Sequence, residues 1–278
     1  MFNMRIKEFY DTQQIQFFSV AQRSKGEIMR SQIDYETGEI LPIERGQSMY
    51  NPFTEKYEKM TKYRPISAEE CARRSCSRTI KAIYDITRCE RWDWFLTFTF
   101  NGDVVNRYDY TECTQKLSDW LSNMRRVAVD MKYIVVPEQH KDGAFHFHGL
   151  MKDVDNLEFR FSGHRDKKGR RVYNVHNYKF GWTTATRVTD FRRSSSYLCK
   201  YVTKDLCAVS KGKKRYWHSL NLNKPVVYEF LLNDSIDYNF LEIIKCCEDD
   251  AYVKQLETSY SKLYYIDGKK QLKIIFVY

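Results

Sequence analysis

Apolar residues along the chain follow spacings that separate strands from helices. Clustered or alternating apolar and β-branched residues predict strands at 15–20, 92–100, 133–136, 144–151, 180–188 and 226–230. The runs 67–89, 111–129 and 194–206 are predicted to be helices. Turn residues predict further hairpins around Thr37-Gly38 and Asp267-Gly268, with an acidic helical stretch before the second.

The order of these elements predicts an α+β fold. Glu70 follows Ser67 by three residues, which forms a capping box at the start of the first helix. The core order, with a hairpin in its middle, predicts a central antiparallel sheet backed by helices on one face, and a basic loop before the strand at 180–188. We expect a β-containing extension at 1–64, the main domain at 65–225 and a C-terminal appendage at 226–278.

The strand at 144–151 carries two histidines, His146 and His148, separated by one phenylalanine. Side chains at i and i+2 of a strand point to the same face, so both imidazoles can reach one metal ion. If the preceding hairpin has a three-residue loop at 141–143, Glu138 lies opposite His146 and shares that face. A two- or four-residue loop would turn Glu138 away. His140 is a competing ligand, and the pair of histidines by itself also fits a half-buried polar strand.

Two imidazoles and one carboxylate are typical of a catalytic metal site, because they leave coordination positions open. Mg²⁺ or Mn²⁺ would suit a phosphate substrate, and the ligand types alone also allow Zn²⁺. The eight cysteines form no CxxC pair and predict reduced thiols.

Charge changes the picture by pointing to a polyanion. The chain of 278 residues has a net charge of +10, and the segment 159–216 contains sixteen Lys and Arg residues but three acidic ones. No apolar run approaches the roughly 20 residues of a spanning helix, so we expect no membrane partner and a location in the host cytoplasm.

Basic residues in this segment are expected to contact nucleic-acid phosphates, although a solvated loop is an alternative for the first of them. They are Arg165, Lys167, Lys168, Arg170, Arg171, Arg192, Arg193, Lys213, Lys214 and Arg215. The neighbouring Tyr216-Trp217-His218 could stack on bases or could pack as an aromatic end of a core element.

Two tyrosines on the helix predicted at 194–206 are candidate nucleophiles. Tyr197 and Tyr201 are four residues apart and share a face, and Lys200 and Lys204 each follow a tyrosine by three residues. The pattern also fits an amphipathic helix with packed tyrosines and solvated lysines. As nucleophiles, the phenols would need a lysine or a metal-bound phosphate nearby, because the ordinary tyrosine pKa is near 10.

Three ordered segments resemble the motifs of the HUH endonucleases: FLTFTF at 95–100, HFHGL at 146–150 and YLCKYVTKD at 197–205. The resemblance is to rolling-circle replication initiators of the two-tyrosine type from single-stranded DNA phages and plasmids, and it covers roughly residues 92–220. It implies an antiparallel sheet with the histidine strand at its centre. The roles it implies are metal ligands at His146 and His148, with Glu138 as a fitting third ligand, and catalytic groups at Tyr197, Tyr201, Lys200 and Lys204.

The resemblance implies a metal-dependent endonuclease and strand transferase that nicks an origin through a covalent 5′-phosphotyrosine and initiates rolling-circle replication. Its substrate would be single-stranded DNA or an origin hairpin. A host helicase and polymerase would be partners, because the chain has no GxxxxGK[ST] loop. A relaxase or single-strand transposase of the same chemistry, and a non-catalytic RRM-like nucleic-acid-binding module, are the alternatives.

Overall fold

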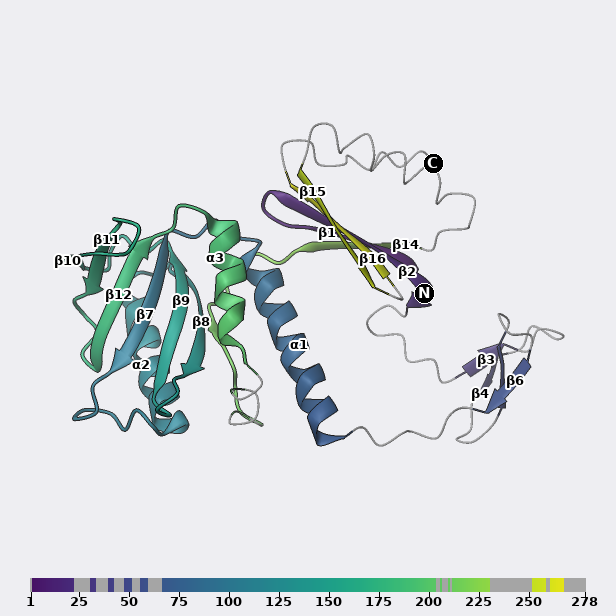
Figure 1. Cartoon of the computed structure of the whole chain (residues 1–278), viewed down its shortest axis with the longest axis horizontal. Helices are drawn as coiled ribbons and strands as arrows, with labels where there is room; N and C mark the ends of the chain where they lie inside the picture. The colour runs from purple at the N-terminus through teal and green to yellow at the C-terminus, as the bar shows by residue number, and fades with distance from the viewer. Residues whose placement is uncertain are drawn as a thin grey trace.

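A computed structural model describes residues 2–22, 31–33, 40–42, 48–51, 56–59, 67–203, 206, 210, 212–230, 252–258 and 261–267. These residues form an α+β fold with one seven-stranded and one five-stranded antiparallel sheet (Figure 1). Short strands add two small pairs, β3 (Ser31–Ile33) with β4 (Ile40–Pro42), and β5 (Ser48–Asn51) with β6 (Lys56–Lys59). The first pair confirms the predicted hairpin, whose turn lies outside the described residues. Within the described part, no helix is long and apolar enough to cross a membrane.

The seven-stranded sheet contains the histidine strand. Its order is β10 (Phe159–Arg165), β11 (Arg171–Val175), β12 (Gly181–Arg187), β7 (Trp94–Phe100), β9 (Phe145–Lys152), β8 (Lys132–Gln139) and β13 (Trp217–His218). Strand β9 carries both histidines and pairs with β7 on one side and β8 on the other. The predicted antiparallel sheet with this strand in its interior is therefore confirmed.

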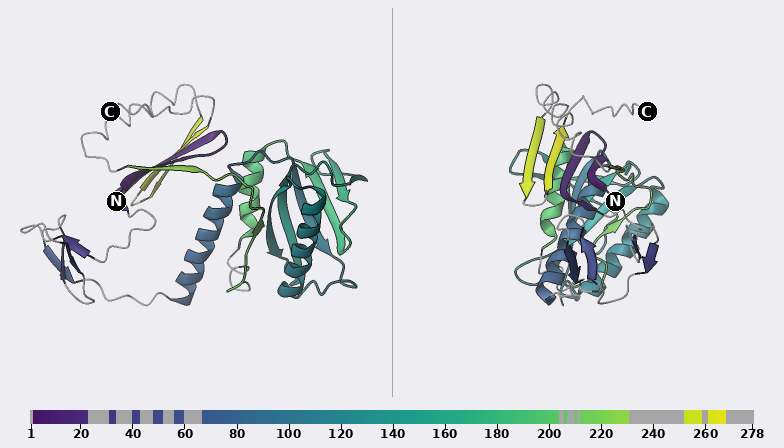
Figure 2. Two further views of the ribbon diagram at one scale, coloured as in Figure 1. Left: turned by 180° about the vertical axis from the view of Figure 1, so that it is seen from behind. Right: turned by 90° about the vertical axis from the view of Figure 1, so that its right-hand side faces the viewer.

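The two faces of this sheet differ because side chains alternate along each strand. On β7 the burial pattern alternates strictly, and Phe98 contacts Trp120 of helix α2 (Tyr110–Val127) with ring centroids 5.1 Å apart. The opposite face presents Thr97 and Thr99 together with both histidines, and we call it the open face. Helix α3 (Phe191–Leu198) lies against β9 on this open face (Figures 1 and 2). The helices are thus divided between two faces rather than gathered on one.

Helix α1 (Ala68–Thr87) begins at the predicted capping box, because the Ser67 side chain accepts a hydrogen bond from the Glu70 backbone N–H. It contacts α3 and the short 3₁₀ helix η1 (Cys199–Tyr201). The thiol of Cys199, for example, donates to the Ile80 carbonyl. Helix α1 therefore supports the segment that carries the tyrosines.

The tyrosine segment differs from the predicted helix at 194–206. Helix α3 starts at Phe191 because the Asp190 side chain caps the Arg193 N–H, and it ends at Leu198. The next three residues tighten into η1, which ends at Val202. Tyr197 therefore lies on α3 and Tyr201 on η1.

The basic segment predicted to be a loop is instead a hairpin of β10 and β11. Its turn is ordered by Asp166, whose carboxylate accepts from the Lys168 and Arg170 backbone N–H groups. Gly169 has a φ of 77°, which a residue with a Cβ adopts rarely. Clustered charge masked the alternation that would have indicated these two strands.

The five-stranded sheet joins both ends of the described chain. Its order is β14 (Val226–Phe230), β1 (Phe2–Glu8), β2 (Thr12–Gln22), β16 (Ser261–Asp267) and β15 (Tyr252–Thr258). The last hairpin turns between Thr258 and Ser261, not at Asp267-Gly268, and the predicted acidic helical stretch lies outside the described residues. The expected domain boundaries stay predictions, but strands of the two expected extensions pair with each other.

This terminal sheet contacts both helices of the open face. The turn between β1 and β2 contributes Asp11, which accepts a 2.8 Å hydrogen bond from Arg192 Nε on α3. The neighbouring Tyr10 packs edge-on against Phe191. On the α1 side, Lys7 forms an ion pair with Asp85. The start of the tyrosine-bearing helix is therefore held by residues from the other end of the sequence.

Candidate active site and nucleic-acid groove

The hairpin between β8 and β9 has the register that the sequence predicted. Glu138 pairs with His146, and Val136 pairs with His148. The loop is closed by a 2.9 Å hydrogen bond from Gly143 N to the His140 carbonyl, and Gly143 has a φ of 89°. A three-residue loop is therefore confirmed, and it places Glu138 on the open face with the histidines.

Both histidines are oriented by threonines of β7 that sequence reasoning did not single out. Thr97 Oγ1 lies 3.0 Å from His148 Nδ1, and Thr99 Oγ1 lies 3.2 Å from His146 Nδ1. A hydroxyl can donate or accept, so each threonine can support either tautomer of its histidine. The Nε2 atoms are left as the ligating atoms, because a hydrogen bond at one ring nitrogen of a metal-binding histidine directs the other nitrogen to the ion. Alternation within FLTFTF, combined with pairing of that strand to HFHGL, was the available signal.

Glu138 joins the histidines through short contacts. Its Oε2 lies 2.6 Å from His148 Nε2 and 3.4 Å from His140 Nε2. The hydrogen bond from His148 lowers the pKa of Glu138 below its ordinary value. His140 stacks on His146 with ring centroids 3.8 Å apart. Burial lowers the pKa of His146 to about 4, so its imidazole is neutral at physiological pH.

The chemistry of these donors fits a divalent cation, since neutral imidazole and carboxylate are its usual ligands. In the described part of the chain, however, no three His, Cys, Asp or Glu side chains are already placed to hold a metal ion. The direct 2.6 Å contact between Glu138 and His148 is a hydrogen bond that a bound ion would have to replace. His140 is close enough to Glu138 to remain the competing ligand.

Both candidate nucleophiles lie against this cluster. The Tyr201 ring stacks on His148 with centroids 3.7 Å apart and planes 12° apart. Tyr197 contacts Tyr201 edge-on, with ring centroids at 5.4 Å, and is 44% exposed. Burial, together with a hydrogen bond to Tyr197, raises the pKa of Tyr201 well above its ordinary value. Lys200 Nζ lies 5.2 Å from the centroid of the Tyr197 ring, whereas Lys204 is outside the described residues.

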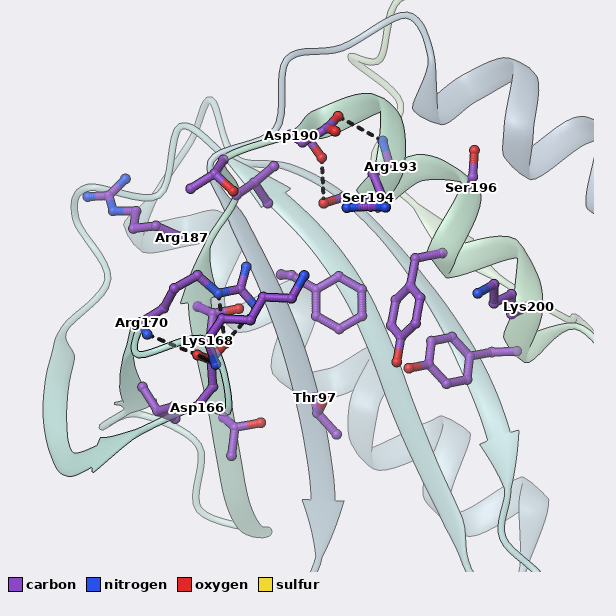
Figure 3. Close-up of a pocket in the computed structure, with 18 residues that line it drawn as sticks. Thr97, Asp166, Lys168, Arg170, Arg187, Asp190, Arg193, Ser194, Ser196 and Lys200 are labelled. Atoms are coloured by element: carbon purple, nitrogen blue, oxygen red, sulfur yellow. Dashed lines mark hydrogen bonds and ion pairs between the residues drawn. The ribbon is translucent and has the colours of Figure 1, made fainter.

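A groove of about 690 Å³ opens beside the tyrosines on the open face, and we call it the α3 groove (Figure 3). Its floor is formed by β7 and β12, one wall by α3 and the other by the β10–β11 turn. Two acidic residues line it, and each is engaged locally: Asp166 by Arg170, and Asp190 by the Arg193 and Ser194 backbone. Its basic lining residues are Lys168, Arg170, Arg187, Arg193 and Lys200.

The groove brings together only part of the predicted basic set. Lys168, Arg170 and Arg193 line it, whereas Arg192 is held by Asp11. Its floor adds groups that the sequence did not reveal, notably the hydroxyls of Thr97, Thr184 and Thr186. The other predicted residues of the hairpin, which do not line the groove, are Arg165, Lys167 and Arg171.

The three remaining basic residues, Lys213, Lys214 and Arg215, line a separate cavity together with Tyr216 and His218. Trp217 between them is only 7% exposed and packs against Phe147, so it belongs to the core on the α2 side. Tyr216 and His218 stack on each other with ring centroids 5.6 Å apart. The aromatic run is therefore split between packing and a partly exposed pair.

Fold and site define an α+β protein whose internal strand presents histidines and a carboxylate to two tyrosines, beside a cation-lined groove. Residues 93–206 match the model of a family of replication-associated proteins, described by its member ORF2. The match runs from just before β7 past η1 and so covers the strands and helix that form the site. It supports a role as a Rep-type replication initiator. Searches of curated proteins and of solved structures gave no match to the chain.

Proposed function

We propose that this protein is a site-specific, metal-dependent endonuclease and strand transferase that nicks single-stranded DNA at an origin and initiates rolling-circle replication. One observation carries the proposal. Tyr201 stacks at 3.7 Å on His148, and both tyrosines line the α3 groove with five basic side chains. Nucleophile, candidate metal ligands and a polyanion-binding surface thus meet at one place on the open face.

The lining of the α3 groove suits a sugar–phosphate backbone. Its cations would neutralise phosphates, and its floor and α3 wall supply hydroxyl groups for phosphate or sugar oxygens. Phe95, which contacts Tyr197, offers an aromatic surface between floor and tyrosines. A strand lying in the groove would pass directly beside both tyrosine rings.

In the proposed reaction, a tyrosine Oη attacks the phosphorus of one phosphodiester. The Oη–P bond forms while the bond from phosphorus to the 3′ oxygen breaks, giving a 5′-phosphotyrosine and a 3′-hydroxyl. The phenolic proton leaves during attack, because Tyr201 is protonated at neutral pH, and the departing 3′ oxygen takes up a proton. Lys200, next to Tyr197, would neutralise charge on the phosphoryl oxygens. The hydrogen-bonded tyrosine pair would let the second phenol act in a later transfer.

His146, His148 and Glu138 would hold the metal ion, with His140 as the alternative third ligand. Bound Mg²⁺ or Mn²⁺ would supply Lewis-acid polarisation of the scissile phosphate. Thr97 and Thr99 would keep the imidazoles aimed at it. Single-stranded DNA or an origin hairpin is the proposed substrate, with a host helicase and polymerase as partners in the host cytoplasm.

The experiment is trapping of the covalent adduct. The protein is incubated with Mn²⁺ and a labelled single-stranded oligonucleotide pool with a randomised centre, and adducts are resolved on a denaturing gel. We expect a labelled protein band for the wild type and for Tyr228→Phe, a control on β14, and none for Tyr197→Phe combined with Tyr201→Phe. An adduct that persists in the double variant would refute the nucleophile assignment, and its absence in the wild type would refute the proposed reaction.

A non-catalytic nucleic-acid-binding module is the second candidate, because Trp182 on the open face is 62% exposed and could stack on a base. EDTA separates the two functions. If the protein is a nuclease, EDTA should abolish cleavage while binding to single-stranded DNA is retained. Binding without cleavage under any metal condition would favour the module.

A further inference from the structure

The cavity beside β13 lies outside the α3 groove and shares no lining residue with it. We call it the β13 cavity. It has a volume of about 410 Å³, and its lining contains three basic residues and no acidic one: Ser75, Thr79, Lys213, Lys214, Arg215, Tyr216 and His218. Such a lining attracts a polyanion as the α3 groove does.

Hydrogen bonds fix one of these cations in place. The Arg215 Nη1 donates to Ser75 Oγ at 2.6 Å, and its Nε donates to Ser210 Oγ at 3.1 Å. The guanidinium is therefore pre-organised by hydroxyls of α1 and of the segment before β13. Lys213 and Lys214 are exposed beside it.

The register of the sheet places the β13 cavity on the open face. Trp217 pairs with Val135 and points to the α2 side, where it meets Phe147. Its neighbours Tyr216 and His218 therefore point to the face that carries the histidines. Continuing the same register by one residue sets Tyr216 opposite Val136, and Val136 pairs with His148.

The two binding surfaces thus lie on opposite sides of the histidine strand. From His148 on β9, the sheet continues through β8 to Tyr216 on β13 in one direction and through β7 to Thr184 on β12 in the other. Each direction covers two strand spacings, or about 10 Å. Tyr201 stacks on His148 between them. A nucleic-acid strand crossing the sheet would meet one surface, then the tyrosine, then the other.

We propose that the β13 cavity is a second single-stranded DNA site, which holds the flank of the substrate across the tyrosines from the α3 groove. Lys213, Lys214 and Arg215 would bind backbone phosphates, and the stacked pair of Tyr216 and His218 would take a base. This inference rests on the proposed function for its direction across the active site. Its consequence is that both DNA ends stay bound after the P–O bond breaks, so that the 3′-hydroxyl remains available for rejoining.

The two surfaces are far enough apart to be separated by probe length. Thr184 and Tyr216 are four strand spacings, about 19 Å, apart. A strand with the 3.4 Å rise of stacked DNA needs about six nucleotides to reach across. A long oligothymidylate can therefore occupy both surfaces, whereas a trinucleotide can occupy one.

The experiment measures the binding of fluorescein-labelled dT20 by anisotropy, and of dT3 by calorimetry, to the full chain at several salt concentrations. For Lys213→Ala with Lys214→Ala, we expect dT20 affinity to fall about tenfold and the salt slope to fall by about 1.4, since two phosphate contacts are lost. The dT3 affinity should stay within about twofold if the trinucleotide occupies the α3 groove. Lys213→Arg with Lys214→Arg should restore dT20 binding.

A matched control removes two lysines on and beside α2, on the other side of the sheet, through Lys116→Ala with Lys179→Ala. The inference is overturned if this control weakens dT20 binding as much as the cavity variant does, or if the cavity variant binds dT20 like the wild type. Loss of a 20-base-pair duplex instead of dT20 would also overturn it, by assigning the cavity to duplex DNA. If the wild type binds dT20 and forms no adduct, the proposed function fails and the second site stands. If it forms the adduct and the cavity variant is unaffected, only the second site fails.

Discussion

Gly149, which directly follows His148, lies where a side chain has no room. A Cβ at this position would lie 2.9 Å from Val135 Cγ2 and 3.1 Å from the Ile134 carbonyl oxygen. Carbon atoms in contact prefer about 3.5–4.0 Å, so Val135 would have to withdraw by at least about 0.6 Å. It is fully buried and paired with Gly149 across β8 and β9, so this movement would disturb the core under the active site.

We therefore expect Gly149→Ala to destabilise the protein. Overpacking of a core costs about 1–3 kcal/mol. The lower entropy of the unfolded chain with alanine offsets about 0.4–1 kcal/mol of that, which leaves a net loss of about 1–2 kcal/mol. Urea denaturation should show a lower midpoint with an unchanged slope. Gly102→Ala is the matched control, because a Cβ there meets nothing within 4 Å, and its effect should stay within about 0.5 kcal/mol.

A double-mutant cycle tests the cause. Val135→Ala removes the atom nearest to the new Cβ, so Val135→Ala with Gly149→Ala should be less destabilised than the sum of the single variants by at least about 0.5 kcal/mol. Additive effects, or a Gly149→Ala variant as stable as Gly102→Ala, would refute the argument from crowding.

Two further outcomes follow from the described contacts. Thr97→Val and Thr99→Val should each weaken Mn²⁺ binding about 10–100-fold in calorimetry, because a histidine loses its orienting hydroxyl; an equal loss in Thr184→Val, on the neighbouring strand, would contradict this. Burial raises the pKa of the Cys113 thiol to about 12 from an ordinary 9.0, so above about pH 9 the folded chain keeps a proton that the unfolded chain releases. The free energy of unfolding should therefore fall between pH 9 and 12, and less steeply in Cys113→Ala; an unchanged fall would contradict the assignment.

The register of the central hairpin could be predicted from sequence because a short turn transmits it. Asp142-Gly143 favours a three-residue loop, and that loop length alone decides that Glu138 faces His146. The alternation of apolar residues on β7 likewise predicted its buried face. These features depend on neighbours in sequence, so a local pattern suffices.

The α3 groove could not be predicted because it depends on contacts between distant segments. Its walls come from a charged hairpin with weak alternation and from a helix whose start is set by the single side chain of Asp190. The tightening of the chain into η1 changed the position of Tyr201 from that on a continuous helix. Arg187 joined the lining only because β12 pairs with β7. Sequence reasoning found the chemical groups but not the surface that collects them.

The five-stranded terminal sheet sets an order of assembly during synthesis. Strands β1 and β2 can pair as soon as they are made, but the partners of their outer edges, β14 and β16, are made more than 200 residues later, as the Arg5–Glu229 ion pair illustrates with a separation of 224 residues. Closing so long a loop is slow, and until it closes the early hairpin has two unpaired edges that can join other chains. The ribosome therefore exposes an aggregation-prone hairpin first and supplies the strands that cover it last. The same hairpin carries Asp11, so the contact that holds the start of the tyrosine helix belongs to a sheet completed only at the end of synthesis.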